Sequence, residues 1–244
     1  MPPADRGDLV FVGDVHLDRA DPDLAAFVDY LRGLAPRAGR IVLMGDLFNL
    51  WIGGGGLEQA HHAVVTACLR ELRAGGTEVH YLEGNRDYRV GRAHRGSAFD
   101  AVDATGLRED WAGLKIWAAH GDLVNARDLQ YRSWRRISRS APVWWLFSSI
   151  PRPRRFALAE SLERRMRGTN LEMKRDFPES IVRDYAARRV AEGDDLVVLG
   201  HFHIERALTI DGAKPGRVFV LPEWKGSRRH LRVDASGRAA FEDS

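Results

Sequence analysis

Seven side chains of the kinds that bind metal ions occur in five short blocks of the sequence. Each block comes at the end of an apolar run, and the residue before its first polar side chain is glycine or alanine. The seven are Asp14, His16, Asp46, Asn85, His120, His201 and His203. A mixture of imidazole, carboxylate and amide ligands suits Mn²⁺, Fe²⁺ or Zn²⁺ and does not suit Ca²⁺ or a thiolate site. We therefore predict a metal centre assembled from all five blocks.

A plainer interpretation exists for each block taken alone. Polar residues after a strand commonly satisfy backbone groups in a turn, and this would explain a single Asp-x-His or His-x-His pair. Five such blocks, each at the end of an apolar run, favour the metal interpretation. We also expect Asp14 and His16 to reach one ion, because residues two apart in an extended segment point the same way.

The apolar runs predict the elements that position these blocks. Short continuous runs predict buried strands, and apolar residues at a helical period predict helices. The five runs that carry the blocks are residues 9–12, 40–44, 78–82, 114–119 and 196–199. Helices are predicted at 24–34 and 57–73, and further strands at 205–210, 217–221, 230–233 and 239–241. This order predicts a layered α/β fold, in which ligands bind where the carboxyl ends of the strands meet.

The region between residues 123 and 190 breaks the pattern. It contains no buried strand and consists of helical, arginine-rich stretches. Residues 126–189 contain sixteen Lys and Arg against seven Asp and Glu, an excess of nine positive charges in a chain whose formal charge is +3. We predict a core made of residues 1–122 and 191–244, with residues 123–190 inserted as a helical lid. Its positive charge favours an anionic partner.

Composition limits the class of protein. With 244 residues, 44% of them hydrophobic and 29% charged, the chain can bury one large core. The single cysteine, Cys68, lies in an apolar stretch and is expected in the core, in a reducing cytoplasm. The start of the chain has no signal-peptide pattern, and the longest apolar run, residues 141–150, is too short to span a membrane.

The five blocks resemble the signature of the calcineurin-like metallophosphoesterases, and they extend from Gly13 to His203. The resemblance implies a four-layer α-β-β-α sandwich and two divalent metal ions, with Mn²⁺ expected, held by catalytic ligands. Carried over by position, one ion would be bound by Asp14, His16, Asp46 and His203. The other would be bound by Asp46, Asn85, His120 and His201, so that Asp46 bridges. Asp122 would orient a ligand histidine.

A narrower resemblance concerns the substrate. The third block reads Gly-Asn-Arg86-Asp87, and arginine is a phosphate clamp where many members of the superfamily have histidine. With Gly45-Asp-Leu-Phe-Asn-Leu-Trp51 and Asp128-x-x-Tyr131, the chain resembles the UDP-2,3-diacylglucosamine pyrophosphatases of lipid A biosynthesis. The resemblance implies cleavage to UMP and 2,3-diacylglucosamine 1-phosphate (lipid X), by attack of metal-bound hydroxide on the α-phosphorus. The substrate contacts would be Asn85, Arg86, Asp128, Tyr131, Lys174 and His201.

The insertion suits a lipid-linked UDP-sugar. Tryptophans such as Trp134 and Trp145 alternate with arginines, a combination typical of membrane interfaces. We therefore expect a monomer that is cytoplasmic, peripherally associated with the inner membrane, and not bound to nucleic acid. The plainer interpretation is that the aromatic residues form the insertion's own small core.

Three other functions stay open at this stage. The chain could be a phosphoesterase of the same fold that acts on another phospholipid, nucleotide-diphosphate derivative or phosphodiester. The last block, Gly-His201-Phe-His203-Ile, departs from the Gly-His-Thr-His-Arg-Pro of well-known members and leaves the substrate open. Stacking of bases on the tryptophans would favour nucleic-acid cleavage. A non-catalytic scaffold would not need a full set of ligands.

Overall fold

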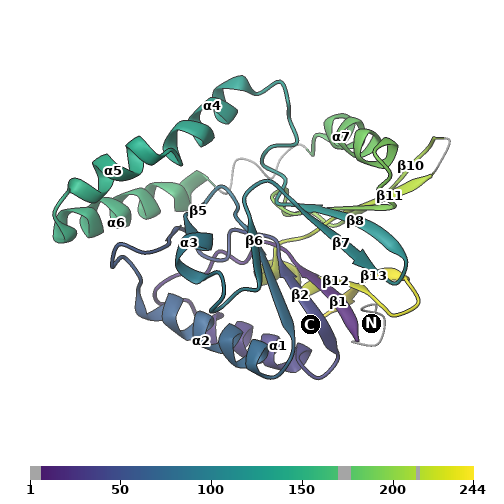
Figure 1. Cartoon of the computed structure of the whole chain (residues 1–244), viewed down its shortest axis with the longest axis horizontal. Helices are drawn as coiled ribbons and strands as arrows, with labels where there is room; N and C mark the ends of the chain where they lie inside the picture. The colour runs from purple at the N-terminus through teal and green to yellow at the C-terminus, as the bar shows by residue number, and fades with distance from the viewer. Residues whose placement is uncertain (1–6, 170–176, 213–214) are drawn as a thin grey trace.

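Two β-sheets form the centre of the protein (Figure 1). The computed structural model describes residues 7–169, 177–212 and 215–244. The larger sheet has six strands in the order β13 (Ala239–Asp243), β12 (Arg229–Val233), β1 (Asp8–Val12), β2 (Ala38–Leu43), β4 (Glu78–Leu82) and β6 (Ala101–Asp103). Strands β1, β2, β4 and β6 are parallel, whereas β12 and β13 pair antiparallel at one edge.

The smaller sheet contains the remaining long strands. Its order is β10 (Arg206–Ile210), β11 (Gly216–Val220), β9 (Leu196–Leu199), β8 (Leu114–Ala119) and β7 (Leu107–Trp111). Strands β11, β9 and β8 are parallel, and β10 and β7 are antiparallel edges. The hairpin predicted from the sequence near residues 205–221 is confirmed as β10 and β11.

Alternation along the strands separates the layers. Leu9 and Phe11 pack between the two sheets, whereas Val10 and Val12 face the helices α1 (Leu24–Leu34) and α2 (Ala60–Ala74). In the smaller sheet, the odd residues of β9 face α7 (Glu179–Ala191) and its even residues face the other sheet. Figure 1 shows α1 and α2 below the sheets and α7 above them. The predicted four-layer α-β-β-α sandwich is confirmed.

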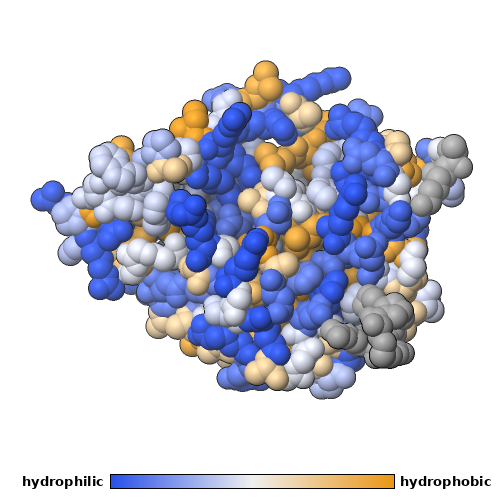
Figure 2. All heavy atoms as spheres, in the orientation of Figure 1, coloured by the Kyte–Doolittle hydropathy of each residue, from blue (hydrophilic) through white to orange (hydrophobic). Residues whose placement is uncertain are grey.

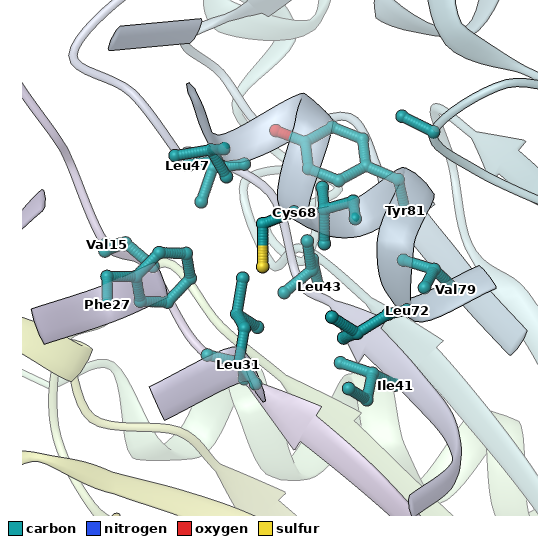
Figure 3. Packing of buried hydrophobic residues seen from close by; sticks show 14 of the residues in the cluster. Val15, Phe27, Leu31, Ile41, Leu43, Leu47, Cys68, Leu72, Val79 and Tyr81 are labelled. Atoms are coloured by element: carbon teal, nitrogen blue, oxygen red, sulfur yellow. The ribbon is translucent and has the colours of Figure 1, made fainter. Parts of the chain in front are cut away.

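The cysteine lies where the sequence predicts. Cys68 is 1% exposed, and its sulfur points among Phe27, Leu31 and Leu43 in the cluster between the larger sheet and its helices (Figure 3). This layer is apolar because each strand contributes every second side chain to it.

Several short elements are absent from the sequence-based prediction. A two-stranded ladder joins β3 (Trp51–Ile52) to β5 (Asp87–Tyr88), and the helices α3 (Val90–His94) and α8 (Trp224–Ser227) are four or five residues long. Strands β6 and β7 were also missed, since polar residues interrupt their apolar pattern. The ladder follows two of the predicted ligand blocks and so stiffens the loops that carry them.

Three consecutive helices lie apart from the sandwich. They are α4 (Leu129–Ser138), α5 (Ala141–Ser149) and α6 (Arg152–Thr169), and Figure 1 shows them extending from one side of the sheets. The helix α7 also falls in the predicted insertion, yet Val182, Ala186 and Val190 pack on the smaller sheet. The division into core and insertion stays a prediction. Among the described residues, no helix has the length and apolar content needed to cross a bilayer.

Candidate metal centre

The five predicted blocks meet in one place, although they lie as far as 189 residues apart. Their side chains follow the carboxyl ends of β1, β2 and β4 in one sheet and of β8 and β9 in the other. Two groups of possible ligands have their ligand atoms within 4.8 Å of one another. These groups are Asp14, His16 and His203, and Asp14, Asp46 and His120.

The first group has the spacing of ligands around one ion. The Nε2 atoms of His16 and His203 are 3.2 Å apart, and Asp14 Oδ1 lies 3.7 Å from His203 Nε2 and 4.0 Å from His16 Nε2. Ligands placed about 2.1 Å from a common ion are separated by about 3 to 4 Å. The carboxylate of Asp46 also approaches this group, with Oδ2 at 4.0 Å from His16 Nε2.

A second convergence involves the other half of the predicted set. The Oδ1 atom of Asn85 lies 3.1 Å from His120 Nε2 and 3.1 Å from His201 Nδ1. His120 Nδ1 lies 2.7 Å from the carbonyl oxygen of Met44, so it carries the proton and leaves Nε2 as a lone pair. Turned over, the Asn85 amide would donate N–H groups to both rings. In that orientation the amide also donates to Asp46 Oδ2 and accepts from Arg86 Nε, so every group is satisfied without a cation. With its oxygen toward the rings, Asn85 Oδ1, His120 Nε2 and His201 Nδ1 are instead placed to bind one cation.

Burial of the carboxylates supports the same interpretation. Asp14 is fully buried and Asp46 is 2% exposed, and Asp14 Oδ1 has no hydrogen-bond partner among the described residues. Its other oxygen accepts from the backbone N–H of His201 at 2.8 Å. A buried carboxylate oxygen without a partner is costly unless a cation binds it. The residues present therefore fit divalent metal ions.

Burial and neighbouring charges shift the pKa values of Asp46, Asp14 and His203 away from their ordinary values. Burial raises the pKa of Asp46 to about 7, and the nearby carboxylates of Asp87 and Asp14 add to this effect against His120. For Asp14 the attraction of His120 and His203 outweighs burial and holds its pKa below the usual range. In His203, burial lowers the pKa, but the nearby carboxylates of Asp14 and Glu223 outweigh it and raise the pKa to about 10.

Two of the imidazoles are poised as neutral ligands. Burial lowers the pKa of His16 to about 3 and that of His201 to about 4. Since a metal ion binds the unprotonated ring nitrogen, these two histidines need not lose a proton at neutral pH before they act as ligands.

Four of the seven predicted ligands have a left-handed backbone. The φ angles are 54° at His16, 49° at Asp46, 71° at His201 and 53° at His203. The expectation that His16 continues an extended segment is therefore wrong, although its side chain still meets Asp14. Left-handed conformations in non-glycine residues cost on the order of 1–3 kcal/mol and cluster at functional sites. Here they turn the side chains of consecutive loops toward one point.

Glycines allow the loops to approach closely. A Cβ atom at Gly84 would lie 2.2 Å from Asp46 Oδ1, and one at Gly45 would lie 2.8 Å from His120 Nδ1. Gly45 also has a φ of 94°, which side-chain-bearing residues rarely adopt. These positions require glycine if Asp46 and His120 are to stand at their observed distances.

Asp87 supports the loops that carry two predicted ligands, Asp46 and Asn85, and the sequence did not predict this role. It is fully buried, and its Oδ2 accepts from the backbone N–H groups of Asp46 at 2.9 Å and Gly84 at 2.8 Å. Tyr81 donates its hydroxyl to the same oxygen at 2.8 Å. Asp87 thereby ties two ligand loops together. The only sign of this role in the sequence is that Asp87 ends the third block, Gly-Asn-Arg-Asp.

Asp122 accepts at Oδ2 from Tyr131 Oη and Arg135 Nε, both at 2.5 Å. Its predicted role of orienting a ligand histidine stays a prediction. Arg135 also donates to the carbonyl oxygen of Glu83, and Arg139 donates to that of Gly84. Helix α4 is therefore attached to the loop that carries Asn85, a contact with no signal in the sequence.

Four of the six predicted substrate contacts, Asn85, Asp128, Tyr131 and His201, line a hollow next to the metal-ligand residues. This pocket has a volume of about 320 Å³ and is lined by Asn85, Gly121, Asp122, Val124, Asn125, Asp128, Tyr131, Pro178, Ile181, His201 and Phe202. Arg86 is buried, and its Nε lies 3.9 Å from Asp46 Oδ2. Asp128 caps α4 by accepting from the backbone N–H of Tyr131 at 2.9 Å. Lys174 lies outside the described residues.

A second hollow is apolar and lies between the insertion and the core. It has a volume of about 220 Å³ and is lined by Leu50, Ile52, Tyr88, Trp134, Ser138, Val143, Trp144, Phe147 and Leu162. Tyr131 and Trp134, less than one turn apart on α4, line the first and the second hollow respectively. The same helix thus borders both the pocket beside the ligands, where polar side chains lie among apolar ones, and a separate apolar cavity.

Comparison with known proteins places this site in a family. Residues 8–205 match the calcineurin-like phosphoesterase family. A UDP-2,3-diacylglucosamine hydrolase of Pseudomonas paraeruginosa is 30% identical over 232 residues, which cover 94% of this chain and 96% of that protein. A protein of the same name from Pseudomonas putida is 32% identical over 250 residues, covering 97% and 100%. A solved Thermotoga maritima protein aligns with a TM-score of 0.46 and 12% identity over 97% of both chains. The match over most of its length shows that the chain belongs to the calcineurin-like phosphoesterase family and is a hydrolase.

Proposed function

We propose that the protein hydrolyses the pyrophosphate bond of UDP-2,3-diacylglucosamine, giving UMP and 2,3-diacylglucosamine 1-phosphate. The names of the relatives motivate this choice of substrate. The observation that carries it is the position of α4, which borders both the pocket beside the ligands and the apolar cavity. A substrate with a charged nucleotide and two acyl chains needs polar groups close to the metal ions and an apolar surface beyond them.

The metal ligands are proposed to be the seven residues predicted from the sequence. Two divalent ions, with Mn²⁺ proposed, would lower the pKa of water and neutralise charge that develops on the phosphoryl oxygens. The chain's own contribution is to hold the ligand atoms in advance, through the left-handed loops and Asp87. Because these groups are already oriented, little reorganisation is needed during the reaction.

Arg86 is proposed to bind a phosphoryl oxygen of the substrate. An arginine in this position stabilises charge on the phosphoryl oxygens but does not deliver a proton to the leaving group. The pocket lined by Asp128 and Tyr131 would bind polar parts of the substrate, and the Tyr131 hydroxyl is held by Asp122. A leaving group that is itself a phosphate needs no general acid, since it departs as an anion of modest basicity.

The apolar cavity is proposed to take part of an acyl chain. Its wall comes from the core through Leu50 and Ile52 and from the insertion through Trp144 and Phe147. Burial of an acyl chain there contributes about 0.8 kcal/mol for each methylene. This would favour the diacylated substrate over UDP-sugars that lack acyl chains.

The outer face of the insertion is proposed to rest on a membrane. Large apolar residues are exposed on α4 and α5, among them Leu129, Ile137, Trp145 and Leu146. Figure 2 shows hydrophobic residues at the surface along the upper edge of the view, where α4 runs. Arginines interleave with them and suit anionic lipid headgroups. We propose a peripheral protein on the cytoplasmic side of the inner membrane.

The test is to incubate the protein and Mn²⁺ with UDP-2,3-diacylglucosamine in ¹⁸O-labelled water and to identify the products. We expect UMP, with the label in its phosphate because attack is on the α-phosphorus. Hydrolysis that gives UDP, or no hydrolysis while a small phosphodiester is cleaved, would contradict this substrate and reaction. The second outcome would favour another phospholipid or nucleotide-diphosphate derivative for the same metal centre.

A further inference from the structure

Three consecutive residues near the end of the chain each contact a different member of the Asp14, His16 and His203 group. Glu223 Oε2 lies 2.9 Å from His203 Nδ1, and the backbone N–H of Trp224 donates to the Asp14 carbonyl at 2.8 Å. Lys225 Nζ donates to the His16 carbonyl, also at 2.8 Å. This segment follows β11 and lies beyond residues 8–205, which match the family.

We propose that Glu223 is a positioning residue, which acts through His203 to set the affinity of one half of the metal centre. The proposal rests on the metal centre proposed above. An imidazole has two nitrogens, and a hydrogen bond to one decides which of them carries the proton. Because the Glu223 carboxylate lies 2.9 Å from Nδ1, it favours a proton on that nitrogen, and this leaves Nε2 unprotonated toward Asp14 and His16, where the ligand atoms converge.

Glu223 makes the two halves of the site unlike. The Nδ1 atom of His120 meets a neutral carbonyl oxygen, that of Met44, whereas the Nδ1 atom of His203 meets a carboxylate. A carboxylate makes the imidazole a more basic ligand, and loss of such a partner costs about 10- to 100-fold in metal affinity. The effect should be greatest on the ion that His203 binds, since Glu223 acts through that ring.

The segment is anchored independently of the glutamate. Trp224 is 1% exposed and packs edge-on against Phe27 of α1, with ring centroids 4.9 Å apart. Lys225 is also paired with Asp21. The carboxylate of Glu223 is 25% exposed. A substitution at Glu223 therefore removes the contact with His203 and leaves the buried anchor in place.

The test compares Glu223→Gln with the matched control Glu242→Gln. Glu242 is 28% exposed and ion-paired with Arg232 on β12, away from the ligand blocks. Mn²⁺ binding is measured by calorimetric titration of the metal-free proteins. We expect two ions in the unaltered protein and in E242Q. In E223Q we expect one ion with unchanged affinity and one bound about 10- to 100-fold more weakly.

The possible failures are distinguishable. Two ions bound by E223Q with unaltered affinity, or both weakened equally, would overturn the role of Glu223 while leaving the metal centre intact. An unaltered protein that binds no Mn²⁺ would instead overturn the metal centre.

If E223Q does not fold, a nitrogen-15 spectrum of the unaltered, metal-loaded protein decides. A proton on Nδ1 of His203 supports the proposal, and its absence contradicts it.

Discussion

The metal centre and the insertion depart from ordinary burial in opposite directions. At the strand ends, charged and polar side chains such as Asp14, Asp46 and His120 are inside. On the insertion, large apolar side chains such as Trp145 and Leu146 are outside. Both arrangements are unfavourable for an isolated folded chain, one through desolvated charge and the other through exposed apolar surface. The difference teaches that each region is suited to a partner of a different kind.

The chemistry of each region indicates the kind of partner it suits. Buried carboxylates among imidazole nitrogens suit cations, whereas an apolar surface interleaved with arginines suits an amphipathic, anionic partner. The two regions are also joined, since Arg135 of α4 and Arg139, directly after this helix, bond to the carbonyls of Glu83 and Gly84, beside Asn85. One helix therefore links the proposed lipid-binding surface to the proposed metal centre.

The largest expected effect is on kcat and comes from a substitution in the metal centre. Asp46→Asn removes the charge of the proposed bridging ligand and should lower kcat by at least about a thousandfold on every substrate, because metal ions supply several kcal/mol of transition-state stabilisation. Initial rates with excess Mn²⁺ measure this. Asp110→Asn, at an exposed acid on β7, is the control and should leave the rate unchanged. An Asp46→Asn rate within tenfold of the unaltered enzyme would refute the ligand assignment.

A smaller effect, limited to lipid substrates, should come from the cavity. Trp134→Ala removes one wall of the apolar hollow and should lower kcat/KM for the diacylated substrate by about 10- to 100-fold, since burial of a large side chain is worth about 1.5–3 kcal/mol. Cleavage of a small phosphodiester should not change. Val64→Ala alters an exposed apolar residue of α2, outside the insertion, and should change neither rate. Equal loss on both substrates would show that Trp134 supports the metal centre.

The exposed face of α5 gives a third comparison. Replacing Trp145 and Leu146 together by serine should weaken sedimentation with anionic phospholipid vesicles by about tenfold, because interfacial binding scales with buried apolar area. Hydrolysis of a soluble phosphodiester should be unaffected. If the double variant binds vesicles as well as the unaltered protein does, this face has another partner. If binding does not depend on anionic lipid, the arginines do not contribute to it.

The last prediction concerns how the free energy of unfolding changes with pH because of the buried imidazole of His62. Burial lowers the pKa of His62 to about 2, and its ring packs on Phe48 at 4.4 Å between centroids. Below pH 6.5, His62 becomes protonated in the unfolded chain but stays neutral in the folded protein. Stability therefore falls with pH, by at most about 1.4 kcal/mol per unit from this group.

Denaturant unfolding of the metal-free protein at pH 7 and pH 5 measures this change. In His62→Gln the fall in unfolding free energy should be smaller. An equal fall in both proteins would mean that His62 titrates normally.

The sequence predicts the ligands better than their supports, for a physical reason. An apolar strand, a glycine and a polar residue form a local pattern, and parallel strands bring such patterns together at one edge. The supports depend on contacts that only the tertiary structure creates. Glu223 reaches His203 from a loop after β11, and Arg135 reaches Asp122 from the insertion.

The backbone conformation of the ligand loops could not be predicted from the sequence pattern either. Asp14-Val-His16 has the composition of a strand end, yet His16 has a φ of 54° because the loop must turn its ring toward His203. Strand β6 was missed because it has only three residues, and its pairing with β4 comes from the sheet and not from its own periodicity.

The most direct test of the account compares UMP release from UDP-2,3-diacylglucosamine and from a UDP-glucosamine without acyl chains, with Mn²⁺. The account predicts that the acylated substrate is cleaved at least about a hundredfold faster in kcat/KM, and that Trp134→Ala narrows this ratio while Asp46→Asn abolishes both reactions. Equal kcat/KM values for the two substrates would contradict the claim that the insertion selects a lipid for the metal centre.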